Sequence, residues 1–151
     1  MKVLLLNGSP RKNGCTYTAL NVVADTLKAE GIDAEVFQAG DPDMENVKAA
    51  AAKLKESDAL VVGSPVYWAS PTGQIIEFMD RLASVAGKDM LYKPAAAVTS
   101  ARRAGTTATL DVLTKYFSYH QMPVVSSCYW NMVHGNAPEE VMRDEEGVQI
   151  M

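Results

Sequence analysis

The loop that follows the first apolar run of the chain has the composition of a phosphate-binding site. Its small residues let the backbone come close to a ligand, and the hydroxyls of Ser9 and Thr16 can donate hydrogen bonds. Arg11 and Lys12 add positive charge, and the helix expected after Gly14 would present unpaired N–H groups. The spacing fits neither a P-loop nor a GxGxxG turn. The alternative interpretation is an ordinary turn between a strand and a helix, with a solvated Arg–Lys pair.

A second unusual loop places Tyr67 and Trp68 between two prolines. Prolines stiffen a loop, and large rings on a loop normally expose apolar surface. A planar heteroaromatic ligand that rests on this loop would account for both features, with the loop backbone making the closer contact. The two rings could instead fill a gap at the edge of the core or at a subunit interface.

The third candidate loop, residues 99–107, is small and polar and carries Arg102 and Arg103. Its backbone N–H groups, with one arginine, could face the polar edge of a ring and stabilise negative charge that develops there. Each arginine could equally be a solvated side chain in front of a helix.

Each of these loops follows a run typical of a buried strand and leads into a segment with helical periodicity. The sequence predicts strands at residues 3–6, 34–37, 59–63, 95–99 and 123–128. It predicts helices at residues 16–30, 44–56, 74–85 and 107–120. This alternation indicates one α/β domain over residues 1–151, with a doubly wound five-stranded parallel sheet in the order 2-1-3-4-5. Ligands of such sheets bind at the carboxyl ends of the strands beside the first strand, where all three loops would lie.

The composition argues against several classes of partner. Lys and Arg number 14 against 18 Asp and Glu, a formal charge of −4, so no basic surface for nucleic acid or for an anionic membrane is expected. No apolar run reaches the roughly 20 residues that a spanning helix needs. Cys15 and Cys128 are far apart and fit neither a disulfide framework nor a metal site. We therefore expect a cytoplasmic protein without a bound metal, and we expect His120 and His134 at a helix end or on the surface.

Two motifs taken together resemble the flavodoxin-like NAD(P)H-dependent FMN oxidoreductases, and most of all the branch that contains the iron–sulfur flavoproteins. These motifs are Gly8–Gly14 and Gly63–Trp68, and the similarity continues through Phe78–Arg81 and Tyr129–Gly135. The resemblance implies a flavodoxin-like fold, FMN as the cofactor and NAD(P)H as the electron donor. Hydride would pass to flavin N5, and the electrons would go on to a small acceptor such as a quinone, a nitro compound, free flavin or a metal ion.

The resemblance also implies roles for individual residues. The first loop would bind the FMN phosphate, the second would line the isoalloxazine ring, and the third would approach its pyrimidine side. The FMN contacts implied in this way are Ser9, Arg11, Asn13, Gly14, Cys15, Thr16, Pro65, Val66, Tyr67, Trp68, Ser100 and Arg103. No catalytic acid or base is required, because the flavin carries the chemistry.

The chain departs from the family pattern in three places. Cys15 stands where Asn or Ser is common, so a backbone contact would survive there but a side-chain contact would not. The stretch Gln38–Val47 is short and lacks cysteine, so we expect no iron–sulfur cluster. The sequence stops at Met151, about where relatives begin a long helix that covers one face of the sheet. Either the apolar face left without that helix needs a partner subunit, or the sequence is trimmed there, and we expect a homodimer or homotetramer.

Two other functions suit the same fold. A flavodoxin-type electron carrier usually needs an acidic docking face, whereas the three loops bring four cationic side chains, which favours an anionic pyridine-nucleotide donor. A non-catalytic redox sensor or scaffold would bind the flavin without turnover. A response-regulator receiver is rejected, because Ser64 and Pro65 stand where an aspartate is needed.

Overall fold

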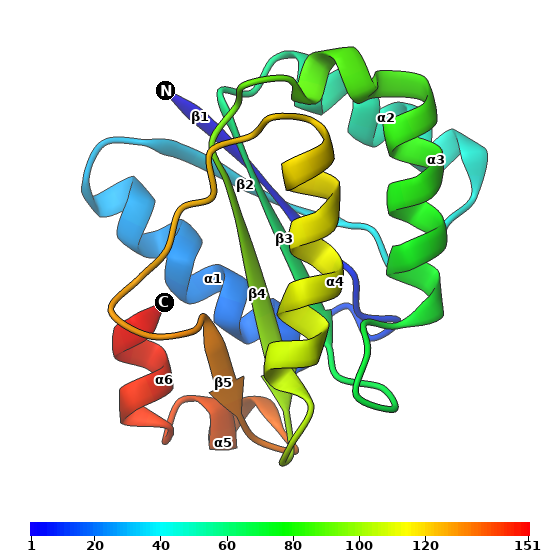
Figure 1. Ribbon diagram of the computed structural model, residues 1–151. Helices are drawn as coiled ribbons and strands as arrows, with labels where there is room; N and C mark the ends of the chain where they lie inside the picture. The colour runs from blue at the N-terminus through cyan, green and yellow to red at the C-terminus, as the bar shows by residue number, and fades with distance from the viewer.

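Five parallel strands form one sheet in the order β2-β1-β3-β4-β5, which confirms the predicted order. The computed structural model describes the whole chain, residues 1–151, and places this sheet between two layers of helices (Figure 1). The strands are β1 (Lys2–Asn7), β2 (Asp33–Gln38), β3 (Ala59–Pro65), β4 (Ala95–Ala101) and β5 (Met132–His134). The strand order reverses between β1 and β3, so their carboxyl ends border the switch point where ligands of such sheets bind.

Four long helices connect the strands and cover the two faces of the sheet. They are α1 (Cys15–Ala29), α2 (Met44–Lys55), α3 (Gly73–Met90) and α4 (Thr106–Tyr119). On β1, Leu4 and Leu6 belong to the core beneath α2, α3 and α4, whereas Leu5 belongs to the core beneath α1. Side chains alternate along a strand, so the almost wholly apolar β1 is buried on both faces.

The prediction of a fifth strand at residues 123–128 is wrong, because β5 lies at Met132–His134. Within the predicted range only Val124 forms a bridge to β4, opposite Ala95. A pair of valines has high β-propensity, but pairing with a neighbour decides whether a segment becomes a strand.

Residues 126–131 leave the edge of the sheet between two points of contact with β4. The Val125 N–H donates to the Ala95 carbonyl at 2.8 Å, and the Thr99 N–H donates to the Asn131 carbonyl at 2.9 Å. Alternate residues of a parallel strand bond to the same neighbour, so Ala97 is the β4 residue that faces this excursion. Its backbone N–H and C=O therefore have no β5 residue beside them.

Helix α3 runs beyond its predicted end at residue 85 to Met90, after a kink at Ala86 with φ −133° and ψ 18°. The kink lies beside the point where α4 packs on α3. There a Cβ atom on Gly87 would lie 2.9 Å from Nε2 of His120, so the absence of a side chain lets the two helices approach.

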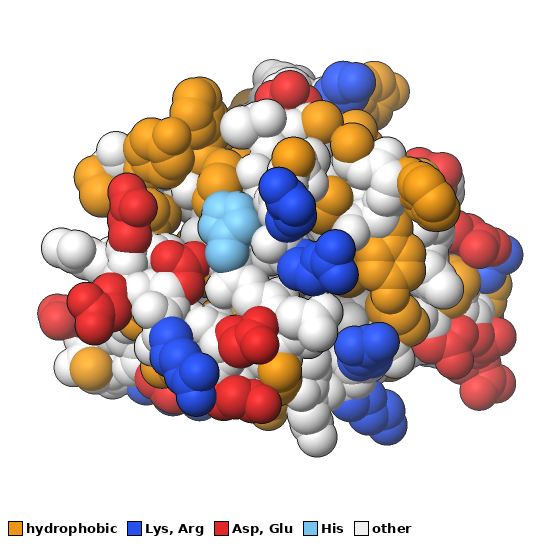
Figure 2. Space-filling view, turned by 90° about the horizontal axis from the view of Figure 1, so that it is seen from below, with side chains coloured by type: hydrophobic (Ala, Val, Ile, Leu, Met, Phe, Trp, Pro, Cys, Tyr) orange, Lys and Arg blue, Asp and Glu red, His pale blue; other side chains and the backbone are white.

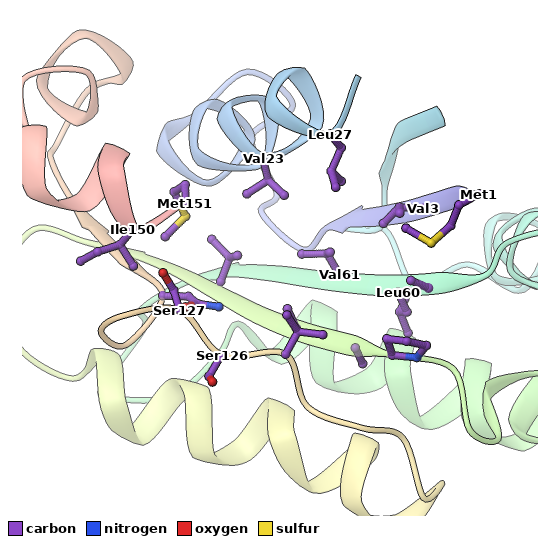
Figure 3. A pocket seen from close by; sticks show the side chains of 17 residues that line it. Met1, Val3, Val23, Leu27, Leu60, Val61, Ser126, Ser127, Ile150 and Met151 are labelled. Atoms are coloured by element: carbon purple, nitrogen blue, oxygen red, sulfur yellow. The ribbon is translucent and has the colours of Figure 1, made fainter. Parts of the chain in front are cut away.

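The two faces of the sheet are covered unequally. Three long helices lie on one side, while α1 shares the other side with the short helices α5 (Pro138–Val141) and α6 (Glu145–Ile150) (Figure 1). On this second side an apolar cavity of about 380 Å³ opens against the sheet, with Val23 and Leu27 of α1 on one wall and Ile150 on another (Figure 3). This cavity lies where a further covering helix was expected to be missing. No helix in the structure is both long and apolar enough to cross a membrane.

Candidate functional site

The three candidate loops meet at the carboxyl edge of the sheet, around a cavity of about 210 Å³. Figure 2 views the molecule from this edge and shows Lys and Arg side chains gathered near its centre, beside apolar side chains. The cavity is lined by Ser9, Arg11, Gly14, Cys15, Thr16, Pro65, Val66, Tyr67, Ser100, Ala101, Arg102, Gly135 and Asn136. The larger apolar cavity of Figure 3 includes none of the three loops, so the smaller one is the candidate site.

The first loop presents a row of free backbone donors. No acceptor within the protein receives the N–H groups of residues 12–17, which include the first turn of α1. Gly14 precedes α1 without a side-chain cap, so these donors stay available to a ligand. The Ser9 hydroxyl accepts the Arg11 N–H at 3.1 Å, which leaves its own hydrogen free to donate. The loop can therefore bind an anion through backbone groups and one hydroxyl.

Two buried contacts tie the first loop to the second. The Gly8 N–H donates to the Gly63 carbonyl at 2.8 Å, and a Cβ atom on Gly8 would lie only 2.7 Å from that same oxygen. The Thr72 hydroxyl donates to the Gly8 carbonyl at 2.9 Å and accepts the Ile75 N–H at 3.2 Å. The residue that caps α3 thus also fixes the entry to the first loop.

The second loop forms a tight hairpin turn at its tip. Tyr67 and Ser70 exchange backbone hydrogen bonds of 2.8 and 3.0 Å, and the two residues between them have positive φ, 54° at Trp68 and 56° at Ala69. Consecutive positive φ values suit the twist of a hairpin, although Asn-Gly usually fills such a turn. Side chains other than glycine in this region store strain, which is common beside ligand sites. The turn leaves Trp68 fully exposed, outside the cavity that Tyr67 lines.

The third loop packs directly against the second. Gly105 has φ 101°, and a Cβ atom there would lie 2.8 Å from both Cα of Ala69 and Cγ1 of Val66. The Val66 N–H also donates to the Ser100 carbonyl at 2.9 Å. Only glycine meets both demands, a left-handed conformation and this close approach. The two loops therefore hold each other in place around the cavity.

Four cationic side chains surround the cavity and form no salt bridge. Arg11 and Arg102 line it, and the neighbouring Lys12 and Arg103 are exposed. All salt bridges of the protein involve other residues, even though the chain carries a net charge of −4. Unpaired cations on an otherwise acidic protein attract an anionic ligand to this edge.

Cys15 lies at the wall of the cavity as a neutral thiol. Its Sγ is 3.6 Å from the carbonyl oxygen of Gly135, and burial raises the pKa of the thiol. Glu140 and Glu139 also raise the pKa, and together these effects outweigh a backbone hydrogen bond and the charge of Arg11, which lower it. A thiol with a raised pKa is a poor nucleophile, so the surroundings of Cys15 do not activate it.

The cavity brings together most of the residues that the resemblance implies as FMN contacts. Those that line it are Ser9, Arg11, Gly14, Cys15, Thr16, Pro65, Val66, Tyr67 and Ser100. Asn13, Trp68 and Arg103 are exposed and lie outside the lining. The lining also contains Ala101 and Arg102 of the third loop, and Gly135 and Asn136. The last two directly follow β5, so the misplacement of that strand hid them from sequence reasoning.

The two histidines do not contribute to this cavity. His120 lies at the end of α4, as expected, but it is buried, with Nδ1 2.7 Å from the Tyr116 carbonyl oxygen. His134 is exposed, and its backbone N–H donates to the Asp144 carboxylate at 2.6 Å. Nowhere do three His, Cys, Asp or Glu side chains come together as a group that could hold a metal ion.

Comparison with known proteins agrees with this geometry. The family described as NADPH-dependent FMN reductase matches residues 1–137. An iron–sulfur flavoprotein of Methanocaldococcus jannaschii is 27% identical over 175 residues, covering 99% of this chain and 91% of the relative. An NADPH azoreductase of a Bacillus species is 28% identical over 117 residues, covering 72% of this chain and 64% of the relative. The flavoenzyme NAD(P)H:acceptor oxidoreductase of Paracoccus denitrificans has the same fold, with a TM-score of 0.72 at 20% identity over 85% of this chain and 77% of that one.

Proposed function

Because the chain belongs to the NADPH-dependent FMN reductase family, we propose that it passes electrons from NAD(P)H through FMN to a small organic acceptor or a metal ion. FMN is its cofactor and NAD(P)H its electron donor, as the family and its flavoprotein relatives indicate. The acceptors that fit best are quinones, nitro compounds and free flavins. The azoreductase relative adds azo compounds to the set that should be tested.

The residues present fit a phosphate-bearing planar cofactor. The free N–H groups of residues 12–17, with the hydroxyls of Ser9 and Thr16, would hold the phosphate. Pro65, Val66 and Tyr67 would support the ring, and Ser100 would lie near its edge. When bound, FMN supplies hydride acceptance and electron donation, and the protein supplies binding and orientation.

One observation supports the oxidoreductase over a one-electron carrier: the unpaired cations around the cavity. The phosphates of a pyridine nucleotide are anionic, so Arg11 and Arg102 would attract the donor to the cofactor. A carrier that docks through an acidic face would need the opposite charge here. The same open cavity would admit donor and acceptor in turn.

We also propose that the protein is a homodimer or homotetramer. The support is the apolar cavity on the α1 side of the sheet and the exposed Val124 and Val125 near it. Sedimentation velocity at several concentrations tests this, and a monomer at all of them would contradict it.

The visible spectrum of the protein tests the proposed function. FMN is added, the excess is removed, and NADPH or NADH is then added without oxygen. Retained flavin that loses its colour supports the oxidoreductase, and the acceptors are then compared by the rate at which colour returns. Retained flavin that neither nucleotide bleaches would contradict the enzyme and favour a carrier or a sensor.

A further inference from the structure

Two amide side chains, Asn7 and Gln38, hydrogen-bond to the backbone of the first loop without lining the cavity. Asn7 is the last residue of β1 and is completely buried, and Gln38 is the last residue of β2. The Asn7 Nδ2 group donates to Oε1 of Gln38 at 2.7 Å, so the two side chains form one unit. Asn7 is fully buried and Gln38 is half-buried on the edge strand β2, and a buried amide is costly unless it is hydrogen-bonded.

Every remaining polar atom of this pair contacts the backbone of the first loop. Asn7 Nδ2 also donates to the Lys12 carbonyl at 3.1 Å, and Asn7 Oδ1 accepts the Ser9 N–H at 3.2 Å. Gln38 Nε2 donates to the Ser9 carbonyl at 2.6 Å. The pair thus fixes both ends of the segment between Ser9 and Lys12.

These contacts decide where the free donors of the loop point. A peptide group is planar and trans, so the Asn13 N–H points away from the side on which Asn7 holds the Lys12 carbonyl. That N–H has no acceptor in the protein. By engaging the carbonyl on one side, Asn7 turns the N–H to the other side and leaves it without a partner in the protein.

The end of β2 is itself held closely against the loop. A Cβ atom on Gly40 would lie 2.1 Å from the Ser9 carbonyl oxygen, so only glycine permits this approach. Asn46 of α2 donates from Nδ2 to the Gln38 carbonyl at 3.0 Å and to the Asp41 carbonyl at 2.8 Å. Gln38 is therefore held in place from α2 while its amide holds the loop.

We infer that Asn7 and Gln38 are positioning residues that orient the first loop for the phosphate of FMN while making no contact with the cofactor. This inference rests on the proposed placement of the phosphate in that loop. The two side chains hydrogen-bond to the first loop and to each other but not to the second or third loop, so their loss should affect binding of the phosphate more than binding of the ring. Riboflavin, which lacks the phosphate, is the ligand that makes this separation measurable.

The test compares the dissociation constants of FMN and riboflavin, measured by the quenching of flavin fluorescence in the wild-type protein and in variants. Gln38→Met keeps the length of the side chain and removes both of its hydrogen bonds. We expect about a tenfold weaker FMN affinity in Gln38→Met and a riboflavin affinity within about twofold of the wild type. Asn7→Leu is expected to act in the same direction.

A matched control and a double variant make the test specific. Ser57 is buried and donates to the Lys53 carbonyl at the opposite edge of the sheet, so Ser57→Ala loses a buried hydrogen bond without touching the loop. We expect the ratio of the two affinities to stay unchanged in Ser57→Ala. Because Asn7 and Gln38 act as one unit, the double variant is expected to lose less than the product of the two single losses.

Each contrary outcome identifies what has failed. A wild-type protein that binds FMN no more tightly than riboflavin would overturn the proposed phosphate site, and the inference with it. A wild-type preference for FMN that Gln38→Met fully retains would overturn the inference alone. An equal loss of both affinities in Gln38→Met would show a general structural role and would also overturn it.

Discussion

The hydroxyl oxygens of Thr16 and Ser100 lie 2.8 Å apart, where α1 begins and β4 ends. Both residues are almost completely buried, yet both line the cavity. One hydroxyl donates to the other, so the pair keeps one hydrogen for a further acceptor. This contact joins the loop expected to bind the phosphate to the loop expected near the ring.

Replacing Thr16 by valine should weaken FMN binding about tenfold and lower the free energy of unfolding by about 1 kcal/mol, because it leaves the Ser100 hydroxyl with one partner fewer. Fluorescence titration and urea unfolding measure the two effects. The matched control is Thr114→Val, which removes a hydroxyl that donates within α4 to the Leu110 carbonyl. FMN affinity unchanged in Thr16→Val would show that this hydroxyl has no part in binding.

Three glycine-to-alanine variants should separate backbone conformation from close packing. Gly73→Ala adds a methyl group in open space and should change the free energy of unfolding by less than about 1 kcal/mol. Gly31→Ala also meets no neighbour but has φ 74°, and should cost about 1 to 2 kcal/mol. Gly105→Ala combines φ 101° with contacts of 2.8 Å and should cost more than either. Equal losses for Gly31→Ala and Gly105→Ala would contradict the packing of the third loop on the second.

Removing the charges of Arg11 and Arg102 should weaken binding of the donor rather than slow the chemical step. We expect the KM for NADPH to rise about threefold or more in each of Arg11→Gln and Arg102→Gln, with kcat nearly unchanged. The difference from the wild type should shrink as salt is added, because salt screens exposed charges. Lys88→Gln, on the distant last turn of α3, is the charge-matched control. A fall in kcat without a change in KM would contradict this role.

The raised pKa of the Cys15 thiol should make this residue slow to alkylate. Burial favours the protonated thiol, so at a given pH less thiolate is present than in the unfolded chain. In a Cys128→Ser variant, iodoacetamide at pH 8 should modify folded protein about tenfold more slowly than protein in urea, and the gap should narrow as pH rises. The folded state also loses stability as the pH rises above the pKa of the unfolded thiol, because the unfolded chain releases its proton first. Equal rates in the folded and unfolded protein would contradict the shift.

Much of the fold was predictable because its signals are local. The apolar runs of the first four strands and the periodicity of the four long helices place these elements close to their observed ends, except for α3, which continues from residue 85 to Met90. The fifth strand was not predictable in the same way. Val124 and Val125 have the stronger β-propensity, but the extended pairing with β4 falls to Met132–His134, and that choice depends on the path of residues 126–131.

The candidate site was also predictable only in part. The sequence identifies which loops meet, because parallel strands put their carboxyl ends at one edge. It does not show which side chains face inward, because this depends on the dihedral angles of the loops. The positive φ of Trp68 leaves that ring in solvent, while its neighbour Tyr67 lines the cavity. In the same way Arg102 lines the cavity and Arg103 does not.

The stretch of β4 at Ala97 that has no β5 residue beside it bears on where the sheet opens locally. β5 is three residues long and joins the sheet along one edge only, whereas β1 has a hydrogen-bonded strand on both sides. Amide protons of Val125 and Val133 should therefore exchange with solvent through a local opening of the outer strand, long before that of Leu6, which faces the central strand β3, exchanges through global unfolding. We expect Gly135 and Asn136, which form one wall of the candidate site, to lie in the part of the chain that opens first.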